Sequence, residues 1–201
     1  ILNAKKYNYT GSATILGKDA QDLGPNGARE LSIGVFPEDR LRLGVLPELK
    51  AFQNFILGYQ RNSKWFSKGI LDWTKIKTLT QTMFDKFKVE PNNINLDFHA
   101  FSGGNQQKIV VARELFHGPE IIIAAHPTRG VDIGAIELIH EQLIQAQEKG
   151  KGVLLISSEL DELLKLSDRI LVVRNGKIIG EQIRANFNEK EIGRKMLGVV
   201  T

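Results

Sequence analysis

Residues 101–108 read Phe-Ser-Gly-Gly-Asn-Gln-Gln-Lys, and they lead directly into a predicted helix over residues 105–117. Apolar residues recur along this helix at helical spacing: Ile109, Ala112, Leu115 and Phe116. Two glycines without a Cβ let the backbone approach a ligand closely, and the free N–H groups of a first helical turn favour an anion. Ser102 can cap the helix or donate to a phosphate oxygen. The stretch therefore predicts an anion-binding helix start, with an ordinary capped helix start as the alternative.

Beyond this helix, short apolar stretches alternate with amphipathic ones. The apolar stretches predict buried strands at residues 121–124, 153–156 and 170–173, with one more strand at 177–181 after the Asn175-Gly176 turn. The amphipathic stretches predict helices at residues 135–149 and 159–166. Strands that are apolar on both faces and alternate with helices are typical of a parallel sheet covered by helices. We therefore predict an α/β fold with a mostly parallel sheet flanked by helices.

The first hundred residues divide into two parts. Strands are predicted at residues 13–16 and 33–36, and Pro37 ends the second. Residues 40–100 instead hold both tryptophans, and apolar residues at helix spacing predict a helix over residues 76–87. We therefore expect a helical insertion at about residues 40–116, between two parts of the sheet.

Composition excludes several classes of protein. The 201 residues contain no cysteine, which excludes a disulfide scaffold, a thiol nucleophile and any metal site with cysteine ligands. The longest uninterrupted apolar stretch, residues 121–125, is far too short to span a bilayer, and nothing marks secretion. The four histidines show no metal-ligand spacing, so no metal site is predicted.

The net charge of +4 comes from the first hundred residues, where 14 Lys and Arg stand against 10 Asp and Glu. Part of this excess is carried by Arg61, Lys64, Lys68, Lys75 and Lys77. Proteins that bind nucleic acids commonly show a far denser basic stripe. We therefore predict an ordinary solvated face and no nucleic-acid partner.

Three segments of the chain together resemble one family. Residues 101–108 resemble the signature motif of ATP-binding-cassette (ABC) transport ATPases, in the form used by the branch that imports simple sugars and nucleosides. Residues 34–40, Gly-Val-Phe-Pro-Glu-Asp-Arg, are similar to the Q-loop region of the second cassette in that branch, with Glu38 at the Q-loop position. Residues 127–132, Pro-Thr-Arg-Gly-Val-Asp, resemble its D-loop, which includes Asp132. From the residues alone, Glu38 is equally a turn residue, and Asp132 equally the N-cap of the next helix.

The resemblance covers essentially the whole chain and implies an ABC-type nucleotide-binding domain truncated at its N-terminal end. Residues 1–201 would form one partial domain, with a core sheet lobe at 1–39 and 117–201 and a helical signature subdomain at 40–116. The phosphate loop of the family, Walker A, is missing from the sequence. It would lie before Ile1, because residues 11–19 resemble the segment that follows its helix.

Three further positions, in two segments, depart from the family pattern. The Walker B strand should end in Asp and Glu, but Ala125 and His126 stand there, and His126 is either a base or an ordinary histidine at a strand end. Ser158 stands where the switch histidine is usual, and Ser158-x-x-Asp161 also fits a capping box. No catalytic residue of this chain is therefore expected to be intact, and a nucleoside-type relative is favoured because one such variant also lacks these carboxylates.

The resemblance implies a function for these residues in a pair of cassettes. The chain would be part of the ATP-binding subunit of an ABC importer for simple sugars or nucleosides, as its second, degenerate cassette. It would donate its signature segment to ATP held by an intact N-terminal cassette: Ser102, Gly103, Gly104, Asn105 and Gln106. ATP and Mg²⁺ would act in the full assembly, which is an ATPase at family level. Neither is expected on this chain alone, which we predict to be inactive.

The same resemblance implies partners and a location. Membrane-spanning permease subunits would contact the chain directly, and a substrate-binding protein indirectly, at the cytoplasmic face of the cell membrane. Residues 50–75, rich in aromatic residues with interleaved Lys and Arg, are either a docking surface or a small subdomain core with a solvated face. Two other functions stay open: an ABC-type protein acting on nucleic acid or ribosomes, and an inactive fragment.

Overall fold

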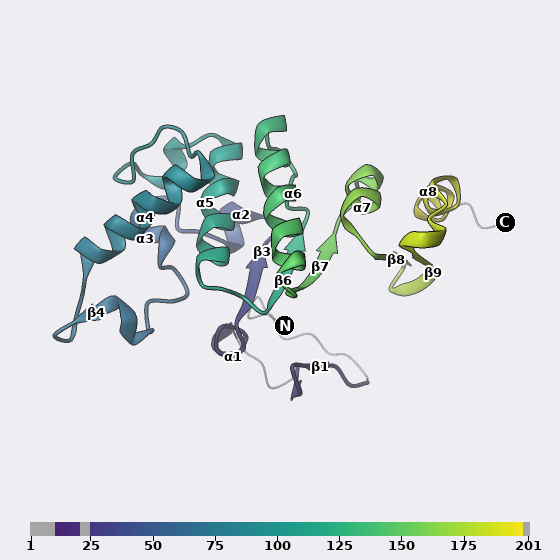
Figure 1. The fold of residues 1–201 in the computed structure, drawn as a ribbon, viewed down its shortest axis with the longest axis horizontal. Helices are drawn as coiled ribbons and strands as arrows, with labels where there is room; N and C mark the ends of the chain where they lie inside the picture. Colours follow the sequence, from purple (N-terminus) through teal and green to yellow (C-terminus); the bar gives the residue numbers. More distant parts are fainter. Residues whose placement is uncertain (1–10, 21–24, 199–201) are drawn as a thin grey trace. The chain divides into compact units, whose positions relative to one another are not determined.

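A computed structural model describes residues 11–20 and 25–198 of the chain (Figure 1). Residues 1–10 and 21–24 of the predicted core lobe lie outside the described residues. The chain forms two compact units, Ile1–Leu154 and Leu155–Thr201, which are described separately. None of the helices in the described part of the chain combines the length and the apolar character needed to cross a bilayer.

The first unit is built around parallel strands. β3 (Ile33–Phe36) pairs in parallel with β6 (Ile121–Ala125), from Ile33 opposite Ile121 to Phe36 opposite Ala124, and the strand order is β3-β6-β7 with β7 at Gly152–Ile156. α5 (Gly103–Phe116) packs against β3 and against α6 (Ile133–Glu148), and α1 (Pro25–Glu30) also contacts β3. The predicted α/β arrangement is confirmed here. It brings the carboxyl ends of β3 and β6 to one edge of the sheet, beside each other.

Residues 40–100, part of the segment 40–116 for which the sequence predicts a helical insertion, contain three α-helices. They are α2 (Arg40–Leu43), α3 (Ala51–Phe55) and α4 (Trp73–Phe87), with short 3₁₀ turns at Ser63–Trp65 and Phe98–Ala100. A hairpin of β4 (Phe66–Ser67) and β5 (Ile70–Leu71) precedes α4. α4 starts three residues before the predicted helix because the side chain of Asp72 caps it by accepting from the N–H of Lys75, at 3.0 Å. α4 packs against α3 and α5, and the largest fully buried side chains of the region are Phe55, Trp65, Ile76, Phe84, Phe87 and Phe98.

A small hairpin of β1 (Thr14–Ile15) and β2 (Lys18–Asp19) lies near the start of the described chain. It matches the strand predicted over residues 13–16, shortened to two residues.

The second unit contains α7 (Leu160–Leu166), β8 (Arg169–Arg174), β9 (Lys177–Ile183) and α8 (Glu189–Leu197), with a 3₁₀ turn at Arg184–Asn186. β8 and β9 form an antiparallel hairpin, and the connecting residues Asn175 and Gly176 both have positive φ, as the predicted turn requires. Its small core joins Ile170 and Val172 of β8 to Ile192 of α8.

Two predicted buried strands are wrong in their burial. β8 was predicted as a third buried strand of the parallel sheet, but it pairs with β9 and buries one face against α8, which leaves Leu171 and Val173 exposed. In β7, Leu154 is 54% exposed and Ile156 46% exposed. An apolar run predicts that a strand can be buried, whereas the segment that covers each face is set by parts of the chain far away in sequence.

Candidate functional site

The predicted anion-binding segment is the start of α5. Ser102 is the N-cap, and its Oγ accepts from the backbone N–H of Asn105 at 3.4 Å and from the Asn105 side-chain amide at 3.0 Å. Ser102 is exposed, and Gly103 and Asn105 are partly exposed. The amides of the first helical turn have no partner within the helix. The capped helix start is thus present. The N–H of Asn105 is taken by Ser102, so the N–H of Gly103 is the first-turn amide that lies at the partly exposed surface without a described hydrogen bond.

The two glycines of this segment are required by the chain's own packing. A Cβ at Gly103 would lie 2.7 Å from Nη2 of Arg40 and 2.9 Å from the carbonyl oxygen of Gly130. A Cβ at Gly104 would overlap Oδ2 of Asp132. The sequence pattern attributes these glycines to the approach of a ligand, whereas here the neighbouring loop at residues 127–132 already fills that space. Gly104 is buried as a result.

Gln106 points into the molecule. Its Nε2 donates to the carbonyl of Phe101 at 2.9 Å, and its Oε1 accepts from Nε of Arg40 at 3.3 Å. Of the five residues predicted to bind nucleotide in trans, Gly104 and Gln106 are therefore buried against this chain. Ser102, Gly103 and Asn105 form the accessible part.

Arg40 joins three segments of the predicted site, and its role was not foreseen beyond its place in the Pro-Glu-Asp-Arg motif. Besides the bond to Gln106, its Nη1 donates to the carbonyl of Arg129 at 3.5 Å. Burial lowers the pKa of its guanidinium, which the charge of Asp39 opposes. Asp39 also caps α2 by accepting from the N–H of Arg42 at 3.1 Å. The only signal in the sequence for this role of Arg40 is its position directly after an acidic pair, Glu38 and Asp39, at the end of a strand.

Glu38, at the predicted Q-loop position, lies just beyond β3 and pairs with Arg129. Its Oε1 lies 2.6 Å from Nη1 of Arg129, and both side chains are more than half exposed. The structure thus brings together residue 38 and the segment of residues 127–132, a contact that the sequence analysis does not predict. Because both side chains are exposed, the ion pair contributes little to the free energy of unfolding.

The end of β6 carries no carboxylate. Ala125 is the last residue of the strand, and His126 follows with φ of +47°. A left-handed conformation is uncommon for a residue with a Cβ, and here it turns the chain sharply out of the sheet. The turn is closed by the N–H of Arg129, which donates to the carbonyl of His126 at 3.1 Å.

Asp132 is the N-cap of α6. Its Oδ1 accepts from the N–H of Ala135 at 2.9 Å while its other oxygen faces Gly104. One of the two interpretations left open, that of a helix cap, is thereby confirmed. The same carboxylate packs the segment at residues 127–132 against the start of α5.

Ser158 is exposed in the second unit, but the predicted capping box is wrong. α7 begins one residue later than predicted, with Glu159 as its N-cap, and Glu159 makes no side-chain capping bond. The nearby serine contact is made instead by Ser157, whose Oγ accepts from the N–H of Glu159 at 3.0 Å.

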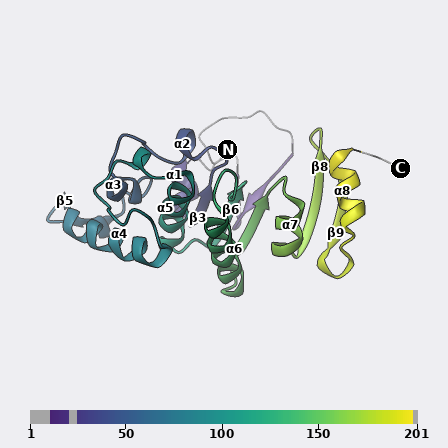
Figure 2. The same ribbon diagram turned by 90° about the horizontal axis from the view of Figure 1, so that it is seen from above.

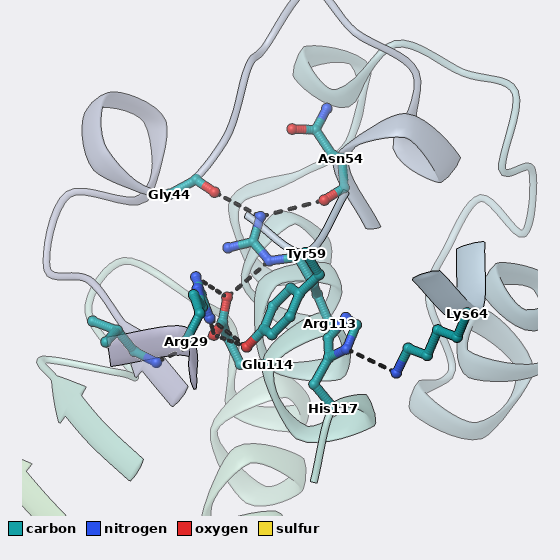
Figure 3. Close-up of polar contacts among 9 residues, drawn as sticks. Arg29, Gly44, Asn54, Tyr59, Lys64, Arg113, Glu114 and His117 are labelled. Atoms are coloured by element: carbon teal, nitrogen blue, oxygen red, sulfur yellow. Dashed lines mark hydrogen bonds and ion pairs between the residues drawn. The ribbon is translucent and has the colours of Figure 1, made fainter. Parts of the chain in front are cut away.

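The first unit contains a buried ionic cluster around Glu114, which the sequence analysis does not predict (Figure 3). Glu114, in the last turn of α5, is completely buried and accepts from both Nη atoms of Arg29, from Nε of Arg113 at 2.9 Å and from the hydroxyl of Tyr59 at 3.1 Å. The N–H of Val35 in β3 also donates to it, at 3.2 Å. Burial alone would raise the pKa of Glu114, but the two guanidiniums and these hydrogen bonds lower it below its usual range.

The cluster fixes α5 to the rest of the first unit. Nη1 of Arg113 donates to the carbonyls of Gly44 at 2.7 Å and Asn54 at 3.3 Å. Burial and the charge of Glu114 raise the pKa of Tyr59, so its hydroxyl stays protonated as a donor. The partners come from five separate segments, the most distant being 85 residues from Glu114 in sequence. The only local signal is a charged pair, Arg113-Glu114, inside an otherwise apolar helix.

Comparisons with known proteins place the chain among transport proteins. The chain is 39% identical over 189 residues to the nucleoside import ATP-binding protein NupA of Lactococcus lactis, which covers 94% of this chain and 37% of NupA. It is 36% identical over 189 residues to the guanosine import ATP-binding protein NupO of Bacillus subtilis, with the same coverage. The galactose/methyl galactoside import ATP-binding protein MglA of Escherichia coli is 36% identical over 92% of this chain and 36% of MglA. The chain therefore spans little more than a third of the length of these relatives.

Solved structures share the fold. The dimeric structure of the bacterial ABC transporter cassette MJ0796 matches with a TM-score of 0.72 at 23% identity, over 89% of this chain and 75% of that one. A nucleotide-free ATP-binding cassette from an ABC transporter matches with a TM-score of 0.71 at 20% identity, over 98% and 76%. The family model described as ABC transporter matches residues 1–129. The chain belongs to the ABC transporter family.

Proposed function

We propose that this chain is the second, degenerate cassette of an ATP-binding subunit in an importer of nucleosides or simple sugars. In this proposal it lends the accessible start of α5 to ATP held by an intact partner cassette. The observation that carries the proposal is the Ser102-capped turn, accessible at Ser102, Gly103 and Asn105, in a chain whose β6 ends without carboxylates. The names of the relatives support import, and the highest of the quoted identities, 39%, is to a nucleoside import protein.

The residues at the end of β6 limit the hydrolytic chemistry that this chain's own nucleotide site could perform. Members of this family use Mg²⁺ with ATP. An Asp and a Glu at the end of the strand would hold the water shell of the ion and activate the attacking water, but the end of β6 has Ala125 and His126 at these positions. In the part of the chain that the structure describes, no three His, Asp or Glu residues converge in a way that could hold a metal ion. These residues do not fit Mg²⁺, so the proposal assigns no hydrolytic step to this strand.

The binding step in the proposal follows from differential contact. The first-turn amides, with the positive end of the α5 dipole, favour the γ-phosphate of ATP when a partner cassette presents it. ATP then stabilises the closed pair of cassettes relative to the open pair, and loss of the γ-phosphate removes that preference. The buried face of the same turn is held by Asp132 and Arg40, which keeps the amides in a fixed orientation.

The remaining parts of the proposal concern organisation and partners. We retain the division into a core lobe at 1–39 and 117–201 and a helical subdomain at 40–116, with the Glu114 cluster fastening one to the other. Permease subunits would bind at the cytoplasmic face of the membrane, with a substrate-binding protein acting on the permease.

The test is the association of this chain with an intact N-terminal cassette of the same kind of subunit. We expect sedimentation velocity to show a heterodimer that forms with ATP and dissociates without it. Ser102→Arg should abolish the heterodimer, because a long cationic side chain would occupy the phosphate position. Ser12→Arg, the same substitution at an exposed serine outside the site, should leave it intact. Equal association of both variants, or association without ATP, would contradict the proposal.

A further inference from the structure

The β4–β5 hairpin and the start of α4 carry an unusual combination of side chains. Among residues 51–84 there are five basic residues, Arg61, Lys64, Lys68, Lys75 and Lys77, and one acidic residue, Asp72. All five basic side chains are exposed. So are three large apolar residues among them: Ile70 is 72% exposed, Phe66 42% and Trp73 40%. We call these eight exposed residues the hairpin surface.

The hairpin projects from the free end of the helical region, in both views of the molecule (Figures 1 and 2). Phe66 pairs with Leu71 and Ser67 with Ile70, and Lys68 and Gly69 form the tip with φ of 52° and 83°. The residue before the hairpin, Trp65, is completely buried next to Phe116, at a ring distance of 5.9 Å. The exposed apolar side chains of the hairpin therefore follow a residue that is fixed in the core.

Three of the basic residues, Lys64, Lys75 and Lys77, make defined contacts with their neighbours. Nζ of Lys64 lies 5.0 Å from the Trp65 ring, and Nζ of Lys75 donates to the carbonyl of Lys64 at 2.8 Å. Trp73 packs edge-on against Phe52 at 5.6 Å, and Nζ of Lys77 lies over the same ring at 4.8 Å. Cationic and apolar groups are thus in contact around Trp65 and Phe52, and the hairpin that carries Phe66, Lys68 and Ile70 lies between these contacts in sequence.

We propose that the hairpin surface binds the anionic surface of a phospholipid bilayer directly. Exposed Lys and Arg are attracted to anionic headgroups, and exposed aromatic and aliphatic side chains enter the boundary between headgroups and acyl chains. The aliphatic Ile70, the most exposed of the three apolar side chains, favours a bilayer over a nucleic acid, because single-stranded nucleic acids are bound by stacking on aromatic rings. The proposal goes beyond the cassette function above, which requires contacts with a partner cassette and permease but none with lipid.

The experiment uses the 201-residue chain and extruded vesicles, without nucleotide, permease or partner cassette. Vesicles of phosphatidylcholine are compared with vesicles of equal parts phosphatidylcholine and phosphatidylglycerol, and binding is measured by co-sedimentation. We expect binding to the anionic vesicles that weakens as salt is added. Brominated lipid should quench the exposed Trp73 and not the buried Trp65, so that Trp73→Phe removes the quenching.

Variants separate this surface from a general effect of positive charge. Replacing Arg61 and Lys68 together with Gln should weaken binding about 25-fold, at about five-fold for each charge. Ile70→Ser should weaken binding and reduce the quenching of Trp73. A control in which Lys149 and Lys190, both exposed and elsewhere in the chain, are changed to Gln removes the same charge and should bind as the unchanged chain. Circular dichroism checks that each variant is folded.

Three results would overturn the proposal. The first is equal binding to neutral and anionic vesicles. The second is equal weakening by the hairpin and control substitutions. The third is stronger binding to a uridine oligonucleotide that the hairpin substitutions abolish, which would assign the surface to nucleic acid. None of these results bears on ATP-dependent pairing of cassettes, so failure here is distinct from failure of the proposed function.

Discussion

One carboxylate oxygen of Asp132 occupies the space that a side chain on Gly104 would need, and the other oxygen caps α6. The D-loop segment and the start of α5 are therefore packed against each other without room for a methyl group. This contact ties the first turn of α5 to the loop that leaves the sheet at β6.

Gly104→Ala should destabilise the chain by about 1–3 kcal/mol, because the added methyl overlaps Asp132. Urea unfolding followed by circular dichroism measures this. Gly134→Ala is the matched control: it lies in α6 with its nearest contact 3.5 Å from the added Cβ, and should be neutral or stabilising by up to about 1 kcal/mol. In a double-mutant cycle Asp132→Ala should relieve part of the cost of Gly104→Ala, and strictly additive costs would contradict the overlap.

Glu114→Gln should cost about 3–5 kcal/mol of unfolding free energy at neutral pH, because it leaves buried guanidiniums without their counter-charge. Since folding lowers the pKa of Glu114, its stabilising effect is present above the unfolded carboxyl pKa and is lost as the pH falls through the folded one. The difference between Glu114→Gln and the unchanged chain should therefore shrink below about pH 4. Glu137→Gln, on an exposed position of α6, is the control and should cost less than about 0.5 kcal/mol.

His117 should make the unfolding free energy depend on pH between pH 7 and pH 5, a higher range than that of Glu114. Burial lowers its pKa to about 3, with the charge of Lys64 adding to the effect, and its ring stacks on Tyr59 at 3.3 Å. Below an unfolded pKa of about 6.5 the unfolded chain takes up a proton that the folded chain does not, so stability falls as the pH falls. We expect a loss of about 2 kcal/mol between pH 7 and pH 5 from this residue. His117→Phe keeps a ring for stacking and should remove that part of the pH dependence in urea titrations; an unchanged slope would show that the histidine is protonated in the folded chain.

The exposed pair of Glu38 and Arg129 should contribute little to stability. Glu38→Gln and Arg129→Gln should each change the unfolding free energy by less than about 1 kcal/mol, with a coupling of the same order in a double-mutant cycle. Added salt should reduce that coupling further. A coupling of several kcal/mol would show that the pair is shielded from water.

The sequence predicts the elements whose character is local. β3 and β6 are each predicted from an apolar run, α4 from its periodicity, and α5 from its periodicity and its cap at Ser102. The pairing of β3 with β6 joins segments far apart in sequence and was not predicted. β8 shows the limit, because the run Ile170–Val173 is equally compatible with a buried strand and with a hairpin that covers one face only. Capping of α6 was one of the two interpretations of Asp132 that the sequence leaves open, because capping needs only the next three residues.

The Glu114 cluster could not be predicted, because it depends on contacts between residues far apart in sequence. Arg29, Tyr59 and Glu114 belong to three segments that are brought together by the packing of α5 on β3. The crowding at Gly104 was equally hidden, since a pair of glycines has the same appearance whether a ligand or a neighbouring loop approaches it. In both cases the residues are evident in the sequence, but the groups that they contact in the fold are not.

Glu114 anchors the last turn of α5 to β3, and Asp132 and Arg40 hold its first turn, so both ends of this helix are fixed within the first unit. The helix start at Ser102 lies about 18 Å from the end at Glu114, at a rise of about 1.5 Å per residue. A shift of the segment at residues 127–132 would therefore reach residue 35 along the whole length of α5, and a shift of β3 would reach Ser102. The helix connects two fixed contacts, one at each end, and transmits displacement between them.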